Sequence, residues 1–103
     1  MEKEVRKLAA GEILMQEGEH ASEMFYVLSG TLQAFKTSEE GERIVLGKIN
    51  AKEFAGEMSF FKEIDRTATV EAMDDVEVVV FAFDKFKDML GAYLLGIMIW
   101  LKP

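Results

Sequence analysis

One arginine and one Gly-Glu pair are the residues of this chain best suited to bind an anion. Gly56 and Glu57 open a short apolar segment, Met58 to Phe61, and Arg66 follows Glu57 after nine residues. A glycine lets the backbone approach a ligand, amide groups at the start of a helical turn point at an anion, and an arginine offers a planar fork of donors. This combination is typical of a phosphate site. The spacing alone is equally compatible with solvated loop charges, because most Glu and Arg side chains lie on the surface.

The other residue types exclude several kinds of chemistry. The chain has no cysteine and a single histidine, His20, so neither thiol catalysis nor a Cys-ligated zinc site is available. We interpret His20 as a loop residue and expect no metal, no cofactor and no enzymatic activity. The net charge of -7 argues against nucleic acid as a partner, because phosphate backbones are bound by clustered Lys and Arg.

Glycines punctuate the sequence and indicate the elements that must hold the site. At intervals of roughly ten residues they separate segments rich in Val, Ile, Leu and Phe, which is typical of an antiparallel sandwich or barrel. These glycines are Gly11, Gly18, Gly30, Gly41, Gly47 and Gly56. With 103 residues the chain has room for one such domain, and its N-terminus lacks the apolar segment of a signal peptide, so we expect a cytoplasmic protein.

Seven segments are predicted to be strands of this sandwich. They are Val5 to Leu8 at an edge, Ile13 to Met15, Met24 to Leu28, Thr31 to Lys36, Arg43 to Ile49, Thr67 to Ala72 and Val76 to Phe83. We expect the third and fourth to form a hairpin at Ser29-Gly30, where glycine can adopt a positive φ. A charged hairpin tip, centred on Gly41, follows at Thr37 to Glu42. The consecutive valines Val78 to Val80 predict a strand buried on both faces in the middle of the sandwich.

A helix is predicted after the sheet, from Asp84 as N-cap to Leu101, because apolar residues there recur at spacings of three and four. Its uncharged run, Met89 to Leu101, has 13 residues, fewer than the roughly 20 that cross a bilayer, so we expect no membrane insertion. The run is apolar nearly all round. It therefore predicts a contact surface, either for a homodimer or partner protein or as a lid over a ligand.

Two groups of residues together form a family pattern. The first is Gly11-Glu12-Ile13, Gly18, Phe25-Tyr26-Val27-Leu28 and Gly30. The second is Phe54-Ala55-Gly56-Glu57 through Arg66-Thr67-Ala68-Thr69-Val70. From about Ala9 to Leu90 the chain thereby resembles the cyclic nucleotide-binding domain family, the sensor module of cyclic-nucleotide-dependent kinases, gated channels and the catabolite activator protein.

The resemblance implies a fold and a set of ligand contacts. The fold is an antiparallel double-stranded β-helix, or jelly roll, with a short cassette helix and a C-terminal helix. Arg66 would bind the cyclic phosphate of cAMP or cGMP, Glu57 the ribose 2'-hydroxyl, and Thr67 the phosphate and the base. The implied ligand-binding residues, which include backbone amides of the phosphate cradle, are Gly56, Glu57, Met58, Arg66, Thr67 and Ala68.

One residue departs from the family pattern. Asp65 stands where the family often has proline, and it places a negative charge beside the expected phosphate. We expect a regulatory module that binds a cyclic nucleotide, moves its C-terminal helix as a lid or hinge, and acts through a partner protein, with no effector region attached. The alternative, favoured by Asp65, is a nucleotide-free jelly roll for interaction or oligomerisation. An enzyme of the cupin type would need several histidines on one metal.

Overall fold

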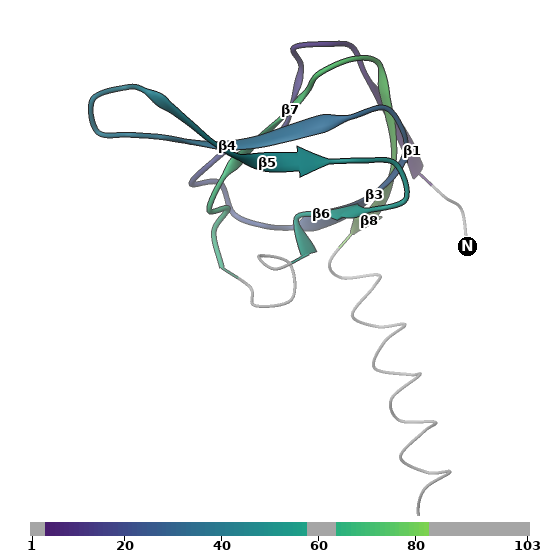
Figure 1. Ribbon diagram of the computed structural model, residues 1–103. Coiled ribbons are helices and arrows are strands. Elements are labelled where there is room, and N and C mark those ends of the chain that lie inside the picture. Colours follow the sequence, from purple (N-terminus) through teal and green to yellow (C-terminus); the bar gives the residue numbers. More distant parts are fainter. Residues whose placement is uncertain (1–3, 58–63, 83–103) are drawn as a thin grey trace, which may run out of the picture.

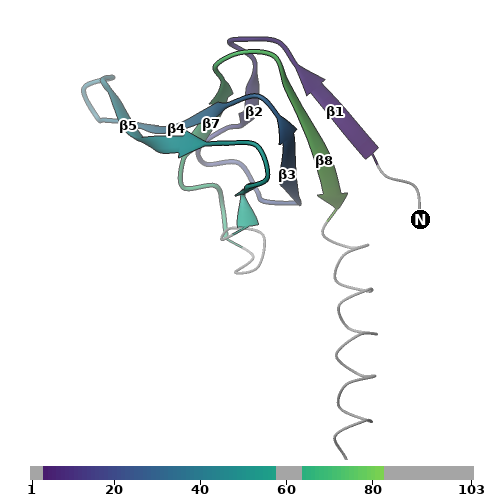
Figure 2. The same cartoon turned by 45° about the vertical axis from the view of Figure 1, so that its right-hand side comes forward.

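The described part of the chain forms two four-stranded antiparallel sheets (Figure 1). The computed structural model of the chain describes residues 4–57 and 64–82. The strands are β1 (Glu4–Leu8), β2 (Ile13–Met15), β3 (Glu23–Ser29), β4 (Leu32–Thr37), β5 (Arg43–Ile49), β6 (Phe54–Ala55), β7 (Thr69–Ala72) and β8 (Val76–Ala82). One sheet has the order β1-β8-β3-β6 and the other β2-β7-β4-β5, and Figure 2 shows them facing each other. The predicted mainly β, antiparallel jelly-roll class is confirmed.

An apolar core lies between the sheets, and the alternation of β3 shows how the sequence builds it. Phe25 and Val27 are buried, whereas Tyr26 is half-buried and Leu28 exposed, because successive side chains point to opposite faces. The core cluster contains Leu8, Met15, Phe25, Val27, Leu32, Ala55, Val70, Ala72, Val76, Val78 and Val80. Both sheets contribute to it, so burial of these residues holds the two sheets together.

Strand β8 is the internal strand that the run of valines predicts. Val78, Val79 and Val80 are all buried, although neighbouring side chains point to opposite faces of the sheet. On one side β8 pairs with the edge strand β1 and on the other with β3. The predicted edge position of Val5 to Leu8 is also confirmed.

The hairpin predicted at Ser29-Gly30 is wrong, because β3 and β4 belong to different sheets. Both strands carry apolar faces that meet across the core, so they must face each other and cannot pair side by side. Gly30 does have a positive φ of 86°, but it forms a corner between the sheets. A Cβ there would overlap with the main-chain oxygen of Asp75, which shows why the corner needs glycine.

Two further expectations need correction. The strand predicted to begin at Thr67 begins at Thr69, because Thr67 and Ala68 line a cavity before the chain enters β7. Gly47 is not at a turn; it lies inside β5, beside an irregularity in the pairing of β4 with β5.

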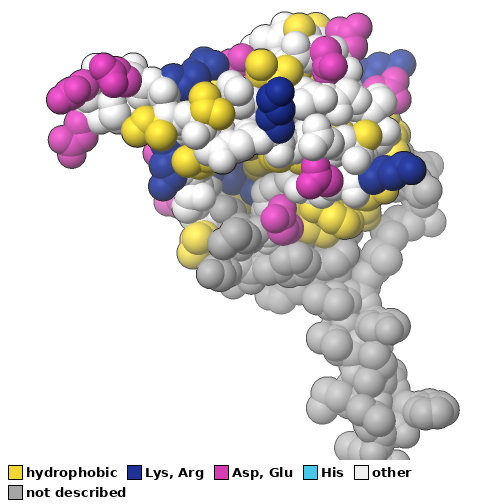
Figure 3. Space-filling model, viewed as in Figure 1, with side chains coloured by type: hydrophobic (Ala, Val, Ile, Leu, Met, Phe, Trp, Pro, Cys, Tyr) yellow, Lys and Arg dark blue, Asp and Glu magenta, His cyan; other side chains and the backbone are white. Residues whose placement is uncertain are grey.

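The predicted hairpin tip between β4 and β5 is confirmed. These strands pair antiparallel, and the Gly41 N–H donates to the Ser38 carbonyl at 2.9 Å within the turn. Figure 3 shows acidic side chains gathered at this projecting tip, where Glu39, Glu40 and Glu42 are exposed. Repulsion from these like charges makes the tip a poor place for an anionic ligand.

Two predicted helical segments lie outside the described residues. They are the turn Met58 to Phe61 and the C-terminal helix from Asp84 to Leu101. Within residues 4–57 and 64–82, no helix has the length and apolar character needed to span a membrane.

Candidate functional site

The backbone of Arg66 is hydrogen-bonded to the loop between β2 and β3. The Arg66 N–H donates to the Glu19 carbonyl at 2.8 Å, and the Arg66 carbonyl accepts from the Gly18 N–H at 2.8 Å. These two hydrogen bonds hold the main chain of the arginine in place before the chain enters β7.

The Arg66 side chain is a buried cation whose hydrogen-bond partners among the described residues are backbone carbonyls. The residue is 7% exposed; its Nη1 donates to the Gly56 carbonyl at 3.0 Å, and its Nη2 donates to the Glu23 carbonyl. Its guanidinium carbon lies 5.9 Å from the centre of the Phe25 ring. Burial lowers the pKa of Arg66, and the negative charges of Glu23 and Glu19 oppose this shift. No carboxylate among the described residues forms an ion pair with it.

Gly56 is the residue that allows the guanidinium to lie where it does. Its φ is 79°, in the left-handed region that glycine adopts without strain. A Cβ at this position would lie 2.5 Å from the Arg66 Nη1 and 2.7 Å from the Met15 Sδ. Glycine therefore serves both the backbone turn and the close approach of the arginine.

A cavity of about 190 Å³ lies beside this arginine. It is lined by Met15, Ala34, Ile49, Phe54, Ala55, Gly56, Glu57, Arg66, Thr67, Ala68 and Val70. The residues from β2, β4, β5 and β7 give it an apolar wall, while Glu57 and Arg66 bring one negative and one positive side chain. A largely apolar hollow with a few polar groups is the usual form of a small-molecule site.

The structure brings together five of the six residues expected to bind a ligand. Gly56, Glu57, Arg66, Thr67 and Ala68 all line the cavity, whereas Met58 lies outside the described residues. Glu57 is half-buried, and its carboxylate forms no hydrogen bond or ion pair with another described residue. An acceptor is therefore available in the cavity wall beside the buried cation.

Three wall residues, Met15, Ala34 and Ile49, were missed by sequence reasoning. Ala34 pairs with Val70 across β4 and β7, and Ile49 pairs with Leu32 across β5 and β4. Their positions at the cavity follow from strand register. The only local signal for them is that apolar residues alternate along their strands, and this does not say which residues meet.

Asp65 does not line the cavity. Its side chain is 70% exposed, and its Oδ1 lies 3.8 Å from the Nδ1 of His20, whose side chain is 75% exposed. The two residues also form an isolated antiparallel bridge between their backbones. The negative charge that sequence reasoning placed beside the phosphate is thus directed to His20 and to solvent.

The described part of the chain holds no cluster of three or more His, Cys, Asp or Glu residues that could bind a metal ion. The described lining residues offer a ligand hydrogen bonds, charge and apolar contact.

Comparison with curated proteins identifies relatives of the whole region. Residues 5–93 match the family model described as the cyclic nucleotide-binding domain. The chain is 29% identical over 87 residues to the cAMP-activated global transcriptional regulator CRP of Salmonella typhimurium, covering 84% of this chain and 41% of that protein. It is 34% identical over 100 residues to the cAMP-dependent protein kinase regulatory subunit of Mycosarcoma maydis, covering 92% of this chain and 19% of that protein. The chain thus spans less than half the length of these relatives.

Solved structures of other proteins have a similar fold. The N-terminal domain of a transcriptional regulator from Streptomyces coelicolor A3(2) superposes with a TM-score of 0.81 at 26% identity, covering 88% of this chain and 63% of that one. The catabolite activator protein of Thermus thermophilus gives 0.80 at 22% identity, covering 94% and 48%. The second similarity shows the fold alone.

Proposed function

The chain belongs to the cyclic nucleotide-binding domain family, and from this membership we propose that its cavity binds cAMP or cGMP and that the domain passes the occupied state on to a partner protein. The names of its relatives, a cAMP-activated regulator and the regulatory subunit of a cAMP-dependent kinase, favour cAMP. They also support a regulatory and not a catalytic role.

The observation that carries this proposal is the buried guanidinium of Arg66. A guanidinium has five N–H donors. Two of them donate to carbonyls, and the other three donate to no described residue. A buried cation without a countercharge is costly, and a phosphate would supply that charge together with charge-assisted hydrogen bonds. A cyclic phosphate carries one negative charge, and Arg66 is the one cation among the described residues that line the cavity.

The remaining cavity walls fit the other parts of a nucleotide. We assign the ribose 2'-hydroxyl to the Glu57 carboxylate, which has no partner among the described residues. Ala34, Ile49 and Val70 form an apolar surface on which a base can lie. The exposed hydroxyl of Thr67 offers a hydrogen bond to the phosphate or to the base, so cGMP stays a candidate beside cAMP.

The second part of the proposal concerns how the domain contacts its protein partner. We propose that residues 1–103 form a single unit whose apolar run, Met89 to Leu101, contacts a second copy or a partner protein. The charge of -7 argues against direct contact of the domain with nucleic acid.

Thermal and chemical denaturation with and without nucleotide test the binding proposal. A ligand at 100 times its dissociation constant raises the free energy of unfolding by about 2.7 kcal/mol. Arg66→Ala would leave the phosphate without its countercharge, at a cost of about 3–5 kcal/mol, which is a hundredfold or more in affinity. Arg66→Lys keeps the charge but lacks the planar fork of donors, and it replaces Arg66→Ala in this test if the alanine variant is unstable.

The matched control is Arg43→Ala. Arg43 is a half-exposed arginine that pairs with Glu71 at 3.2 Å and does not line the cavity, so its loss changes net charge equally. We expect this control to bind nucleotide like the parent chain. No stabilisation of the parent by either nucleotide would contradict the proposal and favour a nucleotide-free interaction module.

A further inference from the structure

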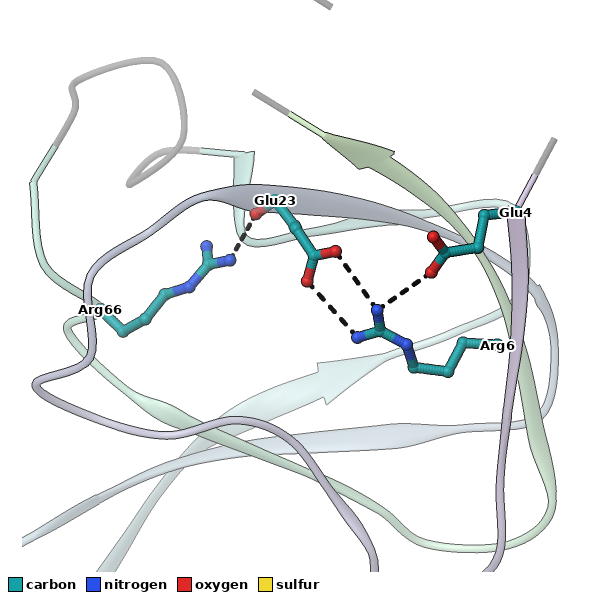
Figure 4. Close-up of polar contacts among 4 residues, drawn as sticks. All are labelled: Glu4, Arg6, Glu23 and Arg66. Atoms are coloured by element: carbon teal, nitrogen blue, oxygen red, sulfur yellow. Dashed lines mark hydrogen bonds and ion pairs between the residues drawn. The ribbon is translucent and has the colours of Figure 1, made fainter. Parts of the chain in front are cut away.

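A second arginine is tied to the anion site through one shared residue. Arg6 on β1 holds both oxygens of the Glu23 carboxylate, with Nη2 3.2 Å from Oε2 and Nη1 3.4 Å from Oε1 (Figure 4). The same Nη2 also donates to Glu4 at 3.0 Å. Because β1 and β3 lie on opposite sides of β8, this ion pair crosses the width of one strand.

Glu23 at the same time contacts Arg66, but only through its backbone. Figure 4 shows the Glu23 side chain directed toward Arg6 while its main-chain oxygen accepts from the Arg66 Nη2. The two guanidinium groups also share one aromatic neighbour: Arg6 lies 5.6 Å and Arg66 5.9 Å from the centre of the Phe25 ring. The carboxylate of Glu23 is thus a nearby anion that pairs with Arg6 and forms no ion pair with Arg66.

We propose that Arg6 is a positioning residue for the anion site: it holds the Glu23 carboxylate away from Arg66, so that the Arg66 guanidinium stays available for a phosphate. This inference rests on the proposed nucleotide binding. A carboxylate binds a guanidinium more strongly than a neutral carbonyl does. If Glu23 were released from Arg6, its carboxylate would compete with the ligand for Arg66.

Stability of the fold is a poor explanation for the Arg6–Glu23 pair. The side chains are 39% and 30% exposed. Ion pairs accessible to solvent contribute little to folding. Burial lowers the pKa of Arg66, and the negative charge of the nearby Glu23 carboxylate opposes this shift.

A double-mutant cycle tests the inference, with dissociation constants for cAMP and cGMP measured by calorimetry at one ionic strength. Arg6→Ala weakens binding at least about threefold, because the freed carboxylate competes. Glu23→Gln in the Arg6→Ala background restores binding to within about twofold of the parent, because the amide carries no negative charge. Glu23→Gln alone binds as tightly as the parent or more tightly.

Lys7→Ala is the matched control. It removes the same charge from the same strand and breaks a pair with Glu77 at 3.7 Å, yet Lys7 does not line the cavity. We expect binding within about twofold of the parent. Arg6→Gln repeats the comparison if the alanine variant is unstable.

A readout without ligand follows the contact itself. The side-chain Nε–H resonance of Arg66 shifts in ligand-free Arg6→Ala, and Glu23→Gln in that background reverses the shift. Equal affinities of Arg6→Ala and Lys7→Ala, or a weakening that Glu23→Gln does not reverse, overturn the inference. If Arg66→Ala abolishes binding but Arg6→Ala does not weaken it, the inference alone fails. If the parent chain binds neither cAMP nor cGMP, both the proposed function and this inference fail.

Discussion

Substitution of Gly56 by alanine is the sharpest test of how the cavity is built. The backbone there has a φ of 79°, and a left-handed conformation costs an alanine about 1–2 kcal/mol. The added Cβ would lie 2.5 Å from the Arg66 Nη1 and 2.7 Å from the Met15 Sδ, so the guanidinium must move. Its 3.0 Å hydrogen bond to the Gly56 carbonyl is then lost, and a bond to a charged group contributes about 1.5–3 kcal/mol.

The sum is a loss of about 2.5–5 kcal/mol in the free energy of unfolding. Gly41→Ala is the matched control, since Gly41 has a φ of 85° but open space where its Cβ would be. It should lose only the backbone part, about 1–2 kcal/mol. The difference between the two variants isolates the displacement of Arg66.

Urea unfolding and nucleotide titration measure the two consequences separately. We expect Gly56→Ala to unfold at a lower urea midpoint than Gly41→Ala and to bind cAMP at least about tenfold more weakly, because 1.4 kcal/mol corresponds to a factor of ten. If Gly56→Ala is as stable as Gly41→Ala and binds as tightly as the parent, then the contact between Gly56 and the arginine does not hold the site.

Two further substitutions test the surroundings of the site. The buried Thr69 hydroxyl accepts from the Gln16 Nε2 at 3.2 Å and the Glu17 N–H at 3.0 Å, so Thr69→Val should lower the free energy of unfolding by about 1–3 kcal/mol in urea. Thr69→Ser, which keeps the hydroxyl, should lose less. Asp65→Asn should change the dissociation constant for cAMP by less than about threefold at physiological salt, because Asp65 is exposed and faces His20. A tenfold tightening would instead show that the Asp65 charge acts on the ligand.

Local patterns in the sequence were sufficient to predict most strands of the fold. The alternation of Phe25 and Val27 with Tyr26 and Leu28 is a property of adjacent residues, and so is the run of valines in β8. Strand length and buried face follow from such short-range patterns, because side chains in a strand alternate between two faces. The Gly-Glu pair and the arginine suggested an anion site by residue type and spacing, and the family resemblance was needed to prefer it over solvated loop charges.

Only the tertiary structure decided how these pieces meet. A glycine turn after β3 is compatible with a hairpin or with a corner between sheets, and the choice depended on the core that β3 and β4 enclose from opposite sides. Asp65 lies beside His20, which is 45 positions away in the sequence. Arg66 contacts Glu23, which is 43 positions away. Contacts of that range arise from packing of whole sheets, and no local pattern encodes them.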